Sequence, residues 1–187
     1  MKLSHLAISG LVLGLLGTGP AQAEALPQIC TEQSDYSHHR LDSDQVDNLC
    51  QVFKGKVVLV VNTASRCGYT EQYDDLEKLY ARYKDKGLLV VGFPSNDFAN
   101  QEPGDEKSIK DFCRLTYGVQ FPMYGKTRVK GGDADPIYLA LAKAAGEAPA
   151  WNFHKYLLDP QGRLIGSYKS RVEPLGEQIT RAIESAL

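Results

Sequence analysis

Two apolar, β-branched runs separated by an amphipathic segment constrain the fold more than any other feature of this sequence. The runs "KVVLVVNTAS" (56–65) and "LLVVGFPS" (88–95) are continuous rather than alternating, which is typical of strands buried on both faces. Between them, leucines and tyrosines recur at spacings of three and four from Leu76 to Tyr83, which predicts a helix that ends at Gly87. A strand, a helix and a strand of this kind form a parallel βαβ unit.

The rest of the chain adds helices and an antiparallel hairpin to this unit. Helical patterns cover 105–118, 135–146 and 173–187, and strand patterns at 151–159 and 163–170 flank the turn "PQG". A parallel pair followed by a hairpin and a helix is the arrangement of a thioredoxin-type sheet. We therefore predict an α/β fold, a thioredoxin-like three-layer sandwich with a central mixed sheet and flanking helices. Residues 24–50 are polar, and we expect irregular structure there.

The N-terminus has the pattern of a signal peptide. A short positive start at Lys2 precedes an apolar run from Leu6 to Leu16, and "AQA" at 21–23 supplies the small residues of a cleavage site. We expect residues 1–23 to be removed near Ala23, leaving one thioredoxin-like domain at 24–187 in an oxidising space, the bacterial periplasm. The apolar run is too short for a membrane span, so no stable membrane association is predicted.

Charge and histidine placement exclude several classes of function. The 21 basic and 23 acidic side chains give a net charge of −2 without any basic run, which argues against a nucleic-acid partner. His38 and His39, near Asp42 and Asp44, lack the spacing of a rigid metal site, and we expect a solvated loop there. We expect His154 to be a surface or edge residue of its strand. No metal ligands are predicted.

Cys67 lies where the first buried strand ends and the first long helix begins. Open parallel sheets place their functional sites at this edge. A helix N-terminus offers free N–H groups and a partial positive charge, which favour a thiolate over a thiol, and Arg66 adds a further positive charge. The alternative is a cysteine that fills a small apolar space. Thr70 occupies the second place of a C-x-x-C motif, so Cys67 must find any disulfide partner elsewhere.

Four segments together resemble the glutathione peroxidase family. They are "GKVVLVVNTASRCGYT", "GFPSNDFANQEPG", "YGVQFPMY" and "WNFHKYLL", in the family's order and spacing, and the resemblance covers about residues 34–187. It implies that Cys67 is the peroxidatic cysteine and that Gln101, Trp151 and Asn152 complete the reactive site. Attack of a thiolate on an O–O bond needs donors that stabilise and protonate the leaving oxygen, and two amides and an indole N–H are such donors.

The other three cysteines leave two questions open. Thiol-dependent family members carry a resolving cysteine in the helix at 105–118, where Cys113 is displaced by one residue from the F-x-C pattern of the resemblance. Cys113 is therefore either the resolving thiol or a packed core residue. Cys30 and Cys50 are expected to form a structural disulfide that fastens the N-terminal segment to the sheet. The alternative is that one of them resolves Cys67.

The sequence as a whole predicts a thiol-dependent peroxidase for defence against oxidative stress. It would reduce hydrogen peroxide or organic hydroperoxides through a sulfenic acid, using a thioredoxin-like protein or glutathione as reductant and no cofactor. The short segment 127–150 leaves little room for an assembly loop, so we expect a monomer. Two alternative functions are possible on this fold. A thiol–disulfide exchange protein requires a C-x-x-C motif, and a copper carrier requires C-x-x-x-C and a histidine.

Overall fold

The sheet is built around β3 (Val57–Thr63), whose seven residues are all buried. Its parallel neighbour β4 (Leu88–Pro94) is equally buried, as the continuous apolar runs predict. The computed structural model describes residues 25–187, so the predicted signal peptide and its cleavage site lie outside the described residues. Between the two strands lie α2 (Gln72–Tyr83) and the 3₁₀ turn η1 (Lys84–Lys86), which ends at Gly87 with a φ of 109°. The βαβ unit is confirmed.

Two antiparallel strands complete the mixed sheet. β5 (Lys155–Leu158) pairs with β3, and β6 (Leu164–Tyr168) pairs with β5, which gives the order β4-β3-β5-β6. The predicted turn between them is held by the Asp159 carboxylate, which accepts hydrogen bonds from the backbone N–H groups of Gln161 and Arg163. Because β5 lies between two strands, both of its edges are hydrogen-bonded.

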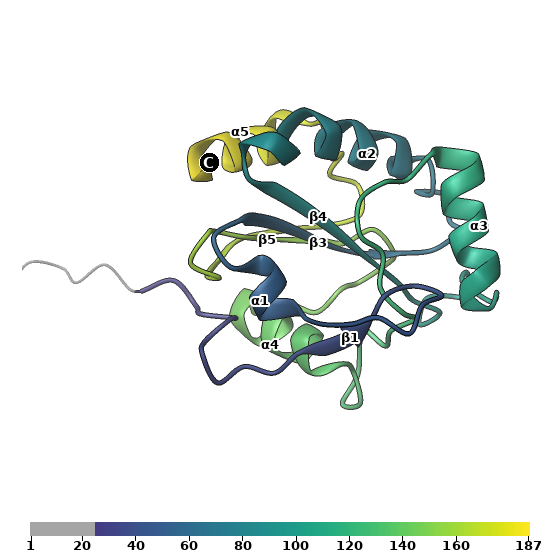
Figure 1. The fold of residues 1–187 in the computed structure, drawn as a ribbon, viewed down its shortest axis with the longest axis horizontal. Helices are drawn as coiled ribbons and strands as arrows, with labels where there is room; N and C mark the ends of the chain where they lie inside the picture. Colours follow the sequence, from purple (N-terminus) through teal and green to yellow (C-terminus); the bar gives the residue numbers. More distant parts are fainter. Residues whose placement is uncertain (1–24) are drawn as a thin grey trace, which may run out of the picture.

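Helices cover both faces of the sheet, so the three-layer prediction is confirmed (Figure 1). α2 and α5 (Glu177–Ala186) pack on the face formed by Val57, Leu59 and Val61. α1 (Leu49–Phe53) and α4 (Pro136–Ala145) pack on the opposite face of the same strand, formed by Val58 and Val60. α3 (Glu106–Tyr117) stands at the end of the sheet and adds Ile109 and Cys113 to the first face.

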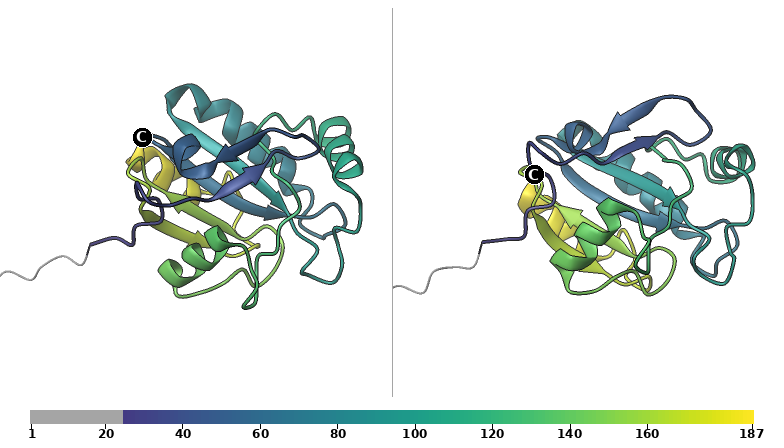
Figure 2. Two further views of the ribbon diagram at one scale, coloured as in Figure 1. Left: turned by 60° about the horizontal axis from the view of Figure 1, so that its bottom comes forward. Right: turned by 90° about the horizontal axis from the view of Figure 1, so that it is seen from below.

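The expectation of irregular structure at 24–50 is wrong. This segment contains the hairpin β1 (Ser37–His39) and β2 (Val46–Asn48) as well as α1. The hairpin reaches toward α3 (Figure 2), where the Glu106 carboxylate bonds His39 and the backbone N–H of Asp42. His38 is likewise not in a solvated loop, because its ring bonds Asp135 at 3.1 Å. The sequence pattern does not indicate this hairpin, because its strands are short and polar and bury little apolar surface.

The expected strand at 151–159 is also partly wrong, and so is the surface placement of His154. Strand pairing begins at Lys155, and residues 151–153 form a turn in which Phe153 has a φ of 63°. His154 is 1% exposed, packs on Tyr156 and bonds the Ser167 hydroxyl. Its burial lowers the pKa of the imidazole to about 4. A histidine beside an interior strand is covered on both sides, which the sequence pattern does not reveal.

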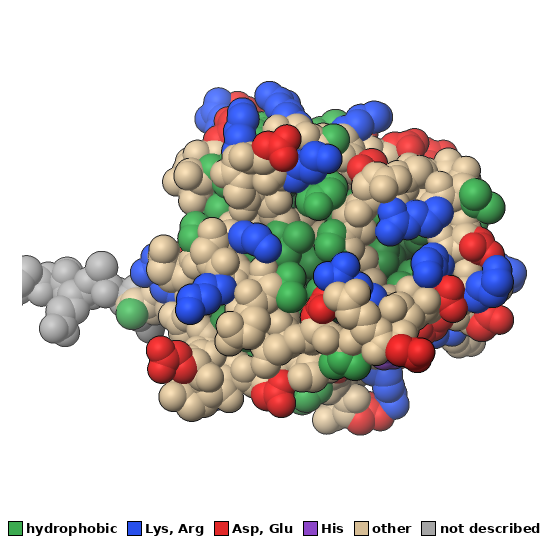
Figure 3. All heavy atoms as spheres, viewed as in Figure 1, with side chains coloured by type: hydrophobic (Ala, Val, Ile, Leu, Met, Phe, Trp, Pro, Cys, Tyr) green, Lys and Arg blue, Asp and Glu red, His purple; other side chains and the backbone are tan. Residues whose placement is uncertain are grey.

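The molecular surface mixes both signs of charge. On the face shown in Figure 3, lysine, arginine and carboxylate side chains are interspersed, with apolar side chains visible in the middle. The edge of β4 is covered by the segment that follows α3, because Tyr124 donates its backbone N–H to the Gly92 carbonyl. Within residues 25–187, no helix combines the length and the apolar character that a membrane crossing needs.

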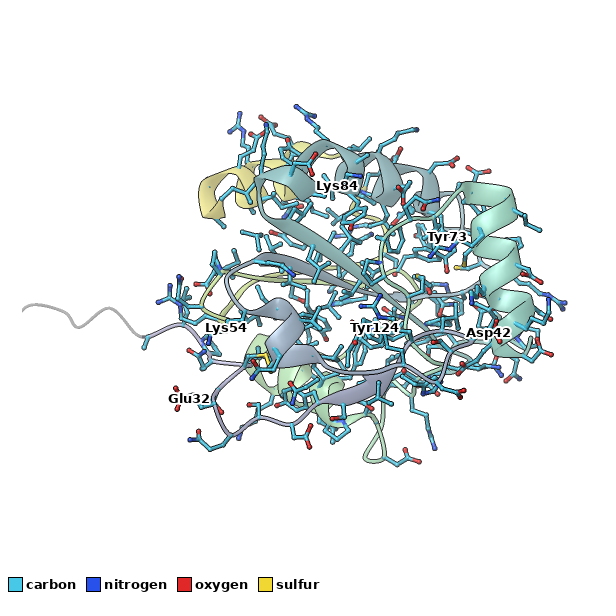
Figure 4. All side chains as sticks on the ribbon, in the orientation of Figure 1. Glu32, Asp42, Lys54, Tyr73, Lys84 and Tyr124 are labelled. Atoms are coloured by element: carbon cyan, nitrogen blue, oxygen red, sulfur yellow. A yellow bond between two sulfur atoms is a disulfide. The ribbon has the colours of Figure 1, made fainter. Side chains whose placement is uncertain are left out.

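Cys30 and Cys50 form a disulfide, as predicted for a structural bond, with Cα atoms 5.3 Å apart. Cys30 packs on the α1–α4 face and contacts the turn between β5 and β6, where a side chain on Gly162 would collide with it. This turn lies at the start of β3, whereas Cys67 follows the end of that strand. Figure 4 shows the disulfide near Lys54, at the other end of the molecule from Tyr73 of α2.

Removing this disulfide is expected to lower stability without affecting the chemistry at Cys67. For a closure of 20 residues, the loss in a Cys30→Ser/Cys50→Ser variant is about 3 kcal/mol of unfolding free energy. Urea unfolding of the variant and of the oxidised wild type measures it, and the rate of Cys67 oxidation by peroxide serves as the control. Unchanged stability, or a variant that folds normally but no longer reacts, would contradict a purely structural role.

Candidate active site

Cys67 sits in a tight turn between β3 and α2 that Thr70 holds in place. The Thr70 hydroxyl accepts the backbone N–H of Cys67 at 2.9 Å and lies 3.0 Å from the Ala64 carbonyl, to which it donates. The backbone N–H of Thr70 in turn donates to the Cys67 carbonyl at 3.0 Å. Thr70, which the sequence offered only as the residue missing from a C-x-x-C motif, therefore fixes the backbone that carries the thiol.

The Cys67 sulfur is half-buried and accepts a hydrogen bond. The backbone N–H of Tyr69 points at the sulfur, with an N···S distance of 3.4 Å. Such a donor stabilises a thiolate more than a thiol, because the charged form is the better acceptor. The N–H comes from the turn that precedes α2, and not from the first turn of the helix as the sequence suggested.

The turn at 151–154 is fastened to the end of β3 by Asn62. This side chain is fully buried; its Nδ2 donates to the Trp151 carbonyl and its Oδ1 accepts the backbone N–H of His154. The Asn62 carbonyl also accepts the backbone N–H of Phe153. These bonds hold Phe153 in a left-handed conformation that costs energy for a residue with a Cβ. They place Trp151 and Asn152 beside the loop of Cys67.

Asn152 and Gln101 are brought into direct contact. The Asn152 Nδ2 donates to Gln101 Oε1 at 2.9 Å, and Asn152 is fully buried. The Gln101 carbonyl accepts the backbone N–H of Arg66, the residue before Cys67, at 3.0 Å. Because the Gln101 side chain uses its oxygen in this pair, its NH₂ group is oriented by the same bond and is the donor that a reacting oxygen can use.

Trp151 is the least enclosed of the predicted residues. It is 37% exposed, and its ring packs on Phe98 of the loop before Gln101, with centroids 5.6 Å apart. Trp151 and Tyr69 line one open pocket of about 370 Å³, together with Lys169, Ser170 and Arg171. The structure thus joins Gln101 and Asn152 by a hydrogen bond and holds Gln101 against Arg66, the residue before Cys67. Trp151 lies in a pocket with Tyr69, two residues after Cys67.

A buried lysine supports the floor of this pocket. Lys155 has no exposed surface, and its ammonium group donates to Gln72 Oε1, at the start of α2, and to the carbonyls of Ser170 and Val172. Three acceptors match the three protons of an ammonium group. Burial nevertheless lowers the pKa of Lys155 to about 7. Lys155 therefore ties the pocket wall at 170–172 to the helix that follows Cys67.

Cys113 is a buried residue of α3, 1% exposed. Burial raises the pKa of its thiol to about 11, only partly offset by the neighbouring Tyr73 hydroxyl. Cys113 belongs to the apolar cluster on the α2–α5 face, and Cys67 packs against the edge of that same cluster. The packing that the sequence left open is therefore present, and it leaves Cys113 on the same side of the sheet as Cys67, away from Cys30.

Three residues of this site escaped the sequence interpretation. Thr70 and Asn62 hold the two turns, and Glu102, beside Gln101, is buried to 1% exposure. Asn62 and Thr63 interrupt an otherwise apolar strand, and a polar residue in a strand buried on both faces is a signal for a buried hydrogen-bonding role. No comparable signal marked Glu102, because a carboxylate in a turn-rich loop is normally solvated.

The buried Lys155 gives a prediction for the pH dependence of stability. Because folding lowers its pKa, the unfolded chain binds more protons between pH 7 and 10.5, so its contribution makes the unfolding free energy rise with pH. Lys155→Met should lose this rise, on the order of 2 kcal/mol between pH 7 and pH 9. Urea unfolding at both pH values measures it, with the exposed Lys54→Met as control. Equal slopes for wild type and Lys155→Met would refute the assignment.

Comparison with known proteins shows similarity to one family. The glutathione peroxidase family model matches residues 34–142. The chain is 50% identical over 138 residues to the glutathione peroxidase-like peroxiredoxin gpx1 of Schizosaccharomyces pombe, covering 72% of this chain and 86% of that protein. It is 41% identical over 162 residues to the hydroperoxy fatty acid reductase gpx1 of Synechocystis, covering 81% of this chain and 94% of that protein.

A solved structure shares the fold at much lower identity. The thiol:disulfide interchange protein of the thioredoxin family from Chlorobium tepidum superposes with a TM-score of 0.65 at 17% identity, covering 88% of this chain and 99% of that one. That likeness shows the thioredoxin-like fold, while the family model and the two relatives extend through the turn of Cys67 and the loop of Gln101. The chain belongs to the glutathione peroxidase family.

Proposed function

We propose that this thiol-dependent peroxidase reduces hydroperoxides at Cys67, with Gln101, Asn152 and Trp151 as its hydrogen-bonding partners. The observation that carries the assignment is the chain of contacts from Asn152 to Gln101 and from the Gln101 carbonyl to Arg66, next to Cys67. It brings the amide pair next to the residue that precedes Cys67, whose sulfur already accepts a backbone N–H. A nucleophile and donors held by rigid turns are what cleavage of a peroxide bond requires.

In the first step the Cys67 thiolate attacks one peroxide oxygen and the O–O bond breaks. The sulfur is oxidised to a sulfenic acid, and the peroxide is reduced to an alcohol or to water. The Gln101 NH₂ group and the Trp151 indole N–H stabilise the negative charge that develops on the leaving oxygen. Neither group carries a permanent charge, so the site also accepts a peroxide with an apolar substituent.

In the second step Cys113 resolves the sulfenic acid. Its thiol displaces the sulfenic oxygen as water and forms a disulfide with Cys67, which an external thiol then reduces. Support comes from the apolar cluster that both cysteines border and from the commitment of Cys30 and Cys50 to a bond on the other face. A thioredoxin-like protein carries two thiols, so it reduces an intramolecular disulfide without leaving a mixed disulfide, and we assign it as the reductant.

The pocket beside Cys67 favours organic hydroperoxides that carry an acidic group. Tyr69 and Trp151 offer aromatic surface, and Lys169 and Arg171 offer positive charge at its rim. A relative of this chain is a hydroperoxy fatty acid reductase, whose substrate combines an apolar chain with a carboxylate. We therefore assign fatty-acid-type hydroperoxides, along with hydrogen peroxide, as substrates.

We further propose that the protein is bacterial, is exported after cleavage near Ala23, and works in the periplasm as a monomer. The leader pattern of residues 1–23 supports export. The Cys30–Cys50 disulfide suits an oxidising compartment. The segment at 127–150 holds α4 and short loops, without an added assembly element. Mass spectrometry of protein from the periplasmic fraction of an expressing cell would show a chain beginning at Glu24, and an intact Met1 would contradict export.

Replacing each free cysteine separates the two steps. Cys67→Ser should abolish peroxide consumption, because a serine hydroxyl is not ionised at neutral pH. Cys113→Ser should keep the first step and accumulate a Cys67 sulfenic acid, detected as a single added oxygen by intact mass after one equivalent of peroxide. Turnover in Cys67→Ser, or a Cys113→Ser protein in which Cys67 still forms an intramolecular disulfide, would overturn these roles.

Truncating the amide pair should slow the first step. Gln101→Ala is expected to lower the rate constant of Cys67 oxidation about 100-fold, because a donor to the leaving oxygen is lost. Asn152→Ala should have a similar effect, and the double variant should lose little more, since the two side chains act as a unit. The exposed Gln120→Ala is the matched control. A Gln101→Ala protein that reacts at the wild-type rate would exclude Gln101 from the chemistry.

A further inference from the structure

A buried carboxyl group lies between the loop of Cys67 and the helix of Cys113. Glu102 is 1% exposed, and its Oε2 makes no hydrogen bond to any described residue. Its carboxylate lies beside the hydroxyl and backbone N–H of Ser65, two residues before Cys67. Its own backbone N–H donates to Asn96 Oδ1 at 2.9 Å, which fixes its position in the loop between β4 and α3.

A small pocket lies beside Glu102, between the loop of Cys67 and the helix of Cys113. The pocket has a volume of about 170 Å³, and one side of it is formed by Ser65 and Arg66 of the Cys67 loop. The other side is formed by α3, including Phe112, the residue before Cys113. Glu102 lines this pocket, and its Oε2 has no hydrogen-bond partner among the described residues. A buried carboxylate oxygen without a hydrogen bond lowers the stability of the folded state, so a purely structural role leaves its retention unexplained.

The surroundings of Glu102 shift the pKa of its carboxyl group in both directions. Burial raises the pKa of Glu102, while Ser65, Lys126 and Arg66 each act to lower it. In the reverse direction, the Glu102 charge raises the pKa values of Cys113 and Tyr73, which face it from α3 and α2. A carboxyl group with a raised pKa passes between its two protonation states more readily near neutral pH than an ordinary one.

Disulfide formation here requires that Cys113 lose a proton and that the oxygen leaving Cys67 gain one, and Glu102 is placed to transfer it. The buried Cys113 is a thiol, but the attacking species must be a thiolate, and the oxygen leaving Cys67 must be protonated. We propose that the Glu102 carboxylate accepts the proton of the Cys113 thiol and delivers it to the oxygen that leaves Cys67. This role rests on the proposed function of Cys113 as the resolving thiol.

The step balances without any further reactant. Glu102 takes the thiol proton, the Cys113 thiolate attacks the sulfenic sulfur, the S–O bond breaks and the S–S bond forms. The protonated carboxyl group then gives its proton to the departing hydroxide, which leaves as water. Cys113 is oxidised, the Cys67 sulfur is reduced from the sulfenic to the disulfide level, and Glu102 returns to the carboxylate.

The test uses Glu102→Gln, which keeps the size of the side chain and removes the titrating group. After one equivalent of peroxide, acid-quenched samples are analysed by intact mass and peptide mapping for the Cys67 sulfenic acid and the Cys67–Cys113 bond. We expect oxidation of Cys67 to stay within about twofold of wild type, while disulfide formation slows about 100-fold. Ser108→Ala, which alters another pocket residue, is the control and should leave both steps unchanged.

A pH series separates proton transfer from a structural effect. In wild type, disulfide formation should slow as the pH falls and Glu102 becomes protonated. In Glu102→Gln the part of the dependence that is due to Glu102 should disappear, leaving a rate that rises with pH only as the Cys113 thiol itself ionises. Glu102→Asp, which retains a carboxyl group, should recover part of the rate. Thermal unfolding of each variant reports on its folding.

Two results would overturn the proposal, and they are distinguishable from a failure of the proposed function. Disulfide formation in Glu102→Gln at the wild-type rate excludes the proton transfer. Equal slowing of both steps with a lowered Tm, unrescued by Glu102→Asp, assigns Glu102 a structural role only. If wild type itself forms no Cys67–Cys113 bond, the resolving role of Cys113 fails first, and the role of Glu102 fails with it.

Discussion

The site depends on the hydrogen bonds that buried Asn62 makes to the turn at 151–154. Asn62 lies next to the end of β3, and its side chain and backbone together satisfy the turn's polar groups. These hydrogen bonds stabilise the left-handed backbone of Phe153 and hold the buried Asn152 in place. Because the loop of Cys67 leaves the same strand only a few residues later, one buried amide sets the relative position of the nucleophile and its donors.

The central sheet also keeps two kinds of cysteine apart. The disulfide Cys30–Cys50 lies on the α1–α4 face near the start of β3, where it fixes the N-terminal segment. Cys67 and Cys113 border the apolar cluster on the opposite face, beyond the end of that strand. Exchange between the structural and the reactive cysteines would disrupt both pairs, and a sheet between them prevents direct attack of one pair on the other.

Much of the fold followed from periodicity, because buried strands and amphipathic helices carry their burial in the sequence. The βαβ unit, the hairpin and the C-terminal helix were predicted in this way and are present. The hairpin β1–β2 was missed because its residues are polar and its stability comes from contacts with α3 and α4, distant in sequence. His154 was misplaced because neighbouring strands and Ser167 enclose it, which a local pattern does not show.

The residues of the site likewise fall into two groups, those that the sequence pattern indicates and those whose role only the structure shows. Cys67 was identifiable from its place at a strand-to-helix junction, whereas Gln101 and Asn152 gain meaning only when a hydrogen bond across 51 residues is seen. Thr70 was noticed for the cysteine that it replaces, and its role in holding the Cys67 turn required the geometry. Residues that act through a partner distant in sequence are not marked by local spacing, so here the resemblance to a family supplied what the pattern could not.

The loop that carries Gln101 and Glu102 would let the two proposed half-reactions share one small site. Ala99 and Asn100 both have left-handed φ angles, of 51° and 52°, which turn the chain sharply just before these two residues. Gln101 then contacts Asn152, on the side where a peroxide would be cleaved, and Glu102 lines the pocket toward α3. Adjacent side chains in an extended or turning backbone point in different directions, so a single loop serves both places. A displacement of this loop would therefore alter oxidation and resolution together, and its strained backbone has a functional rationale that neither residue alone would give.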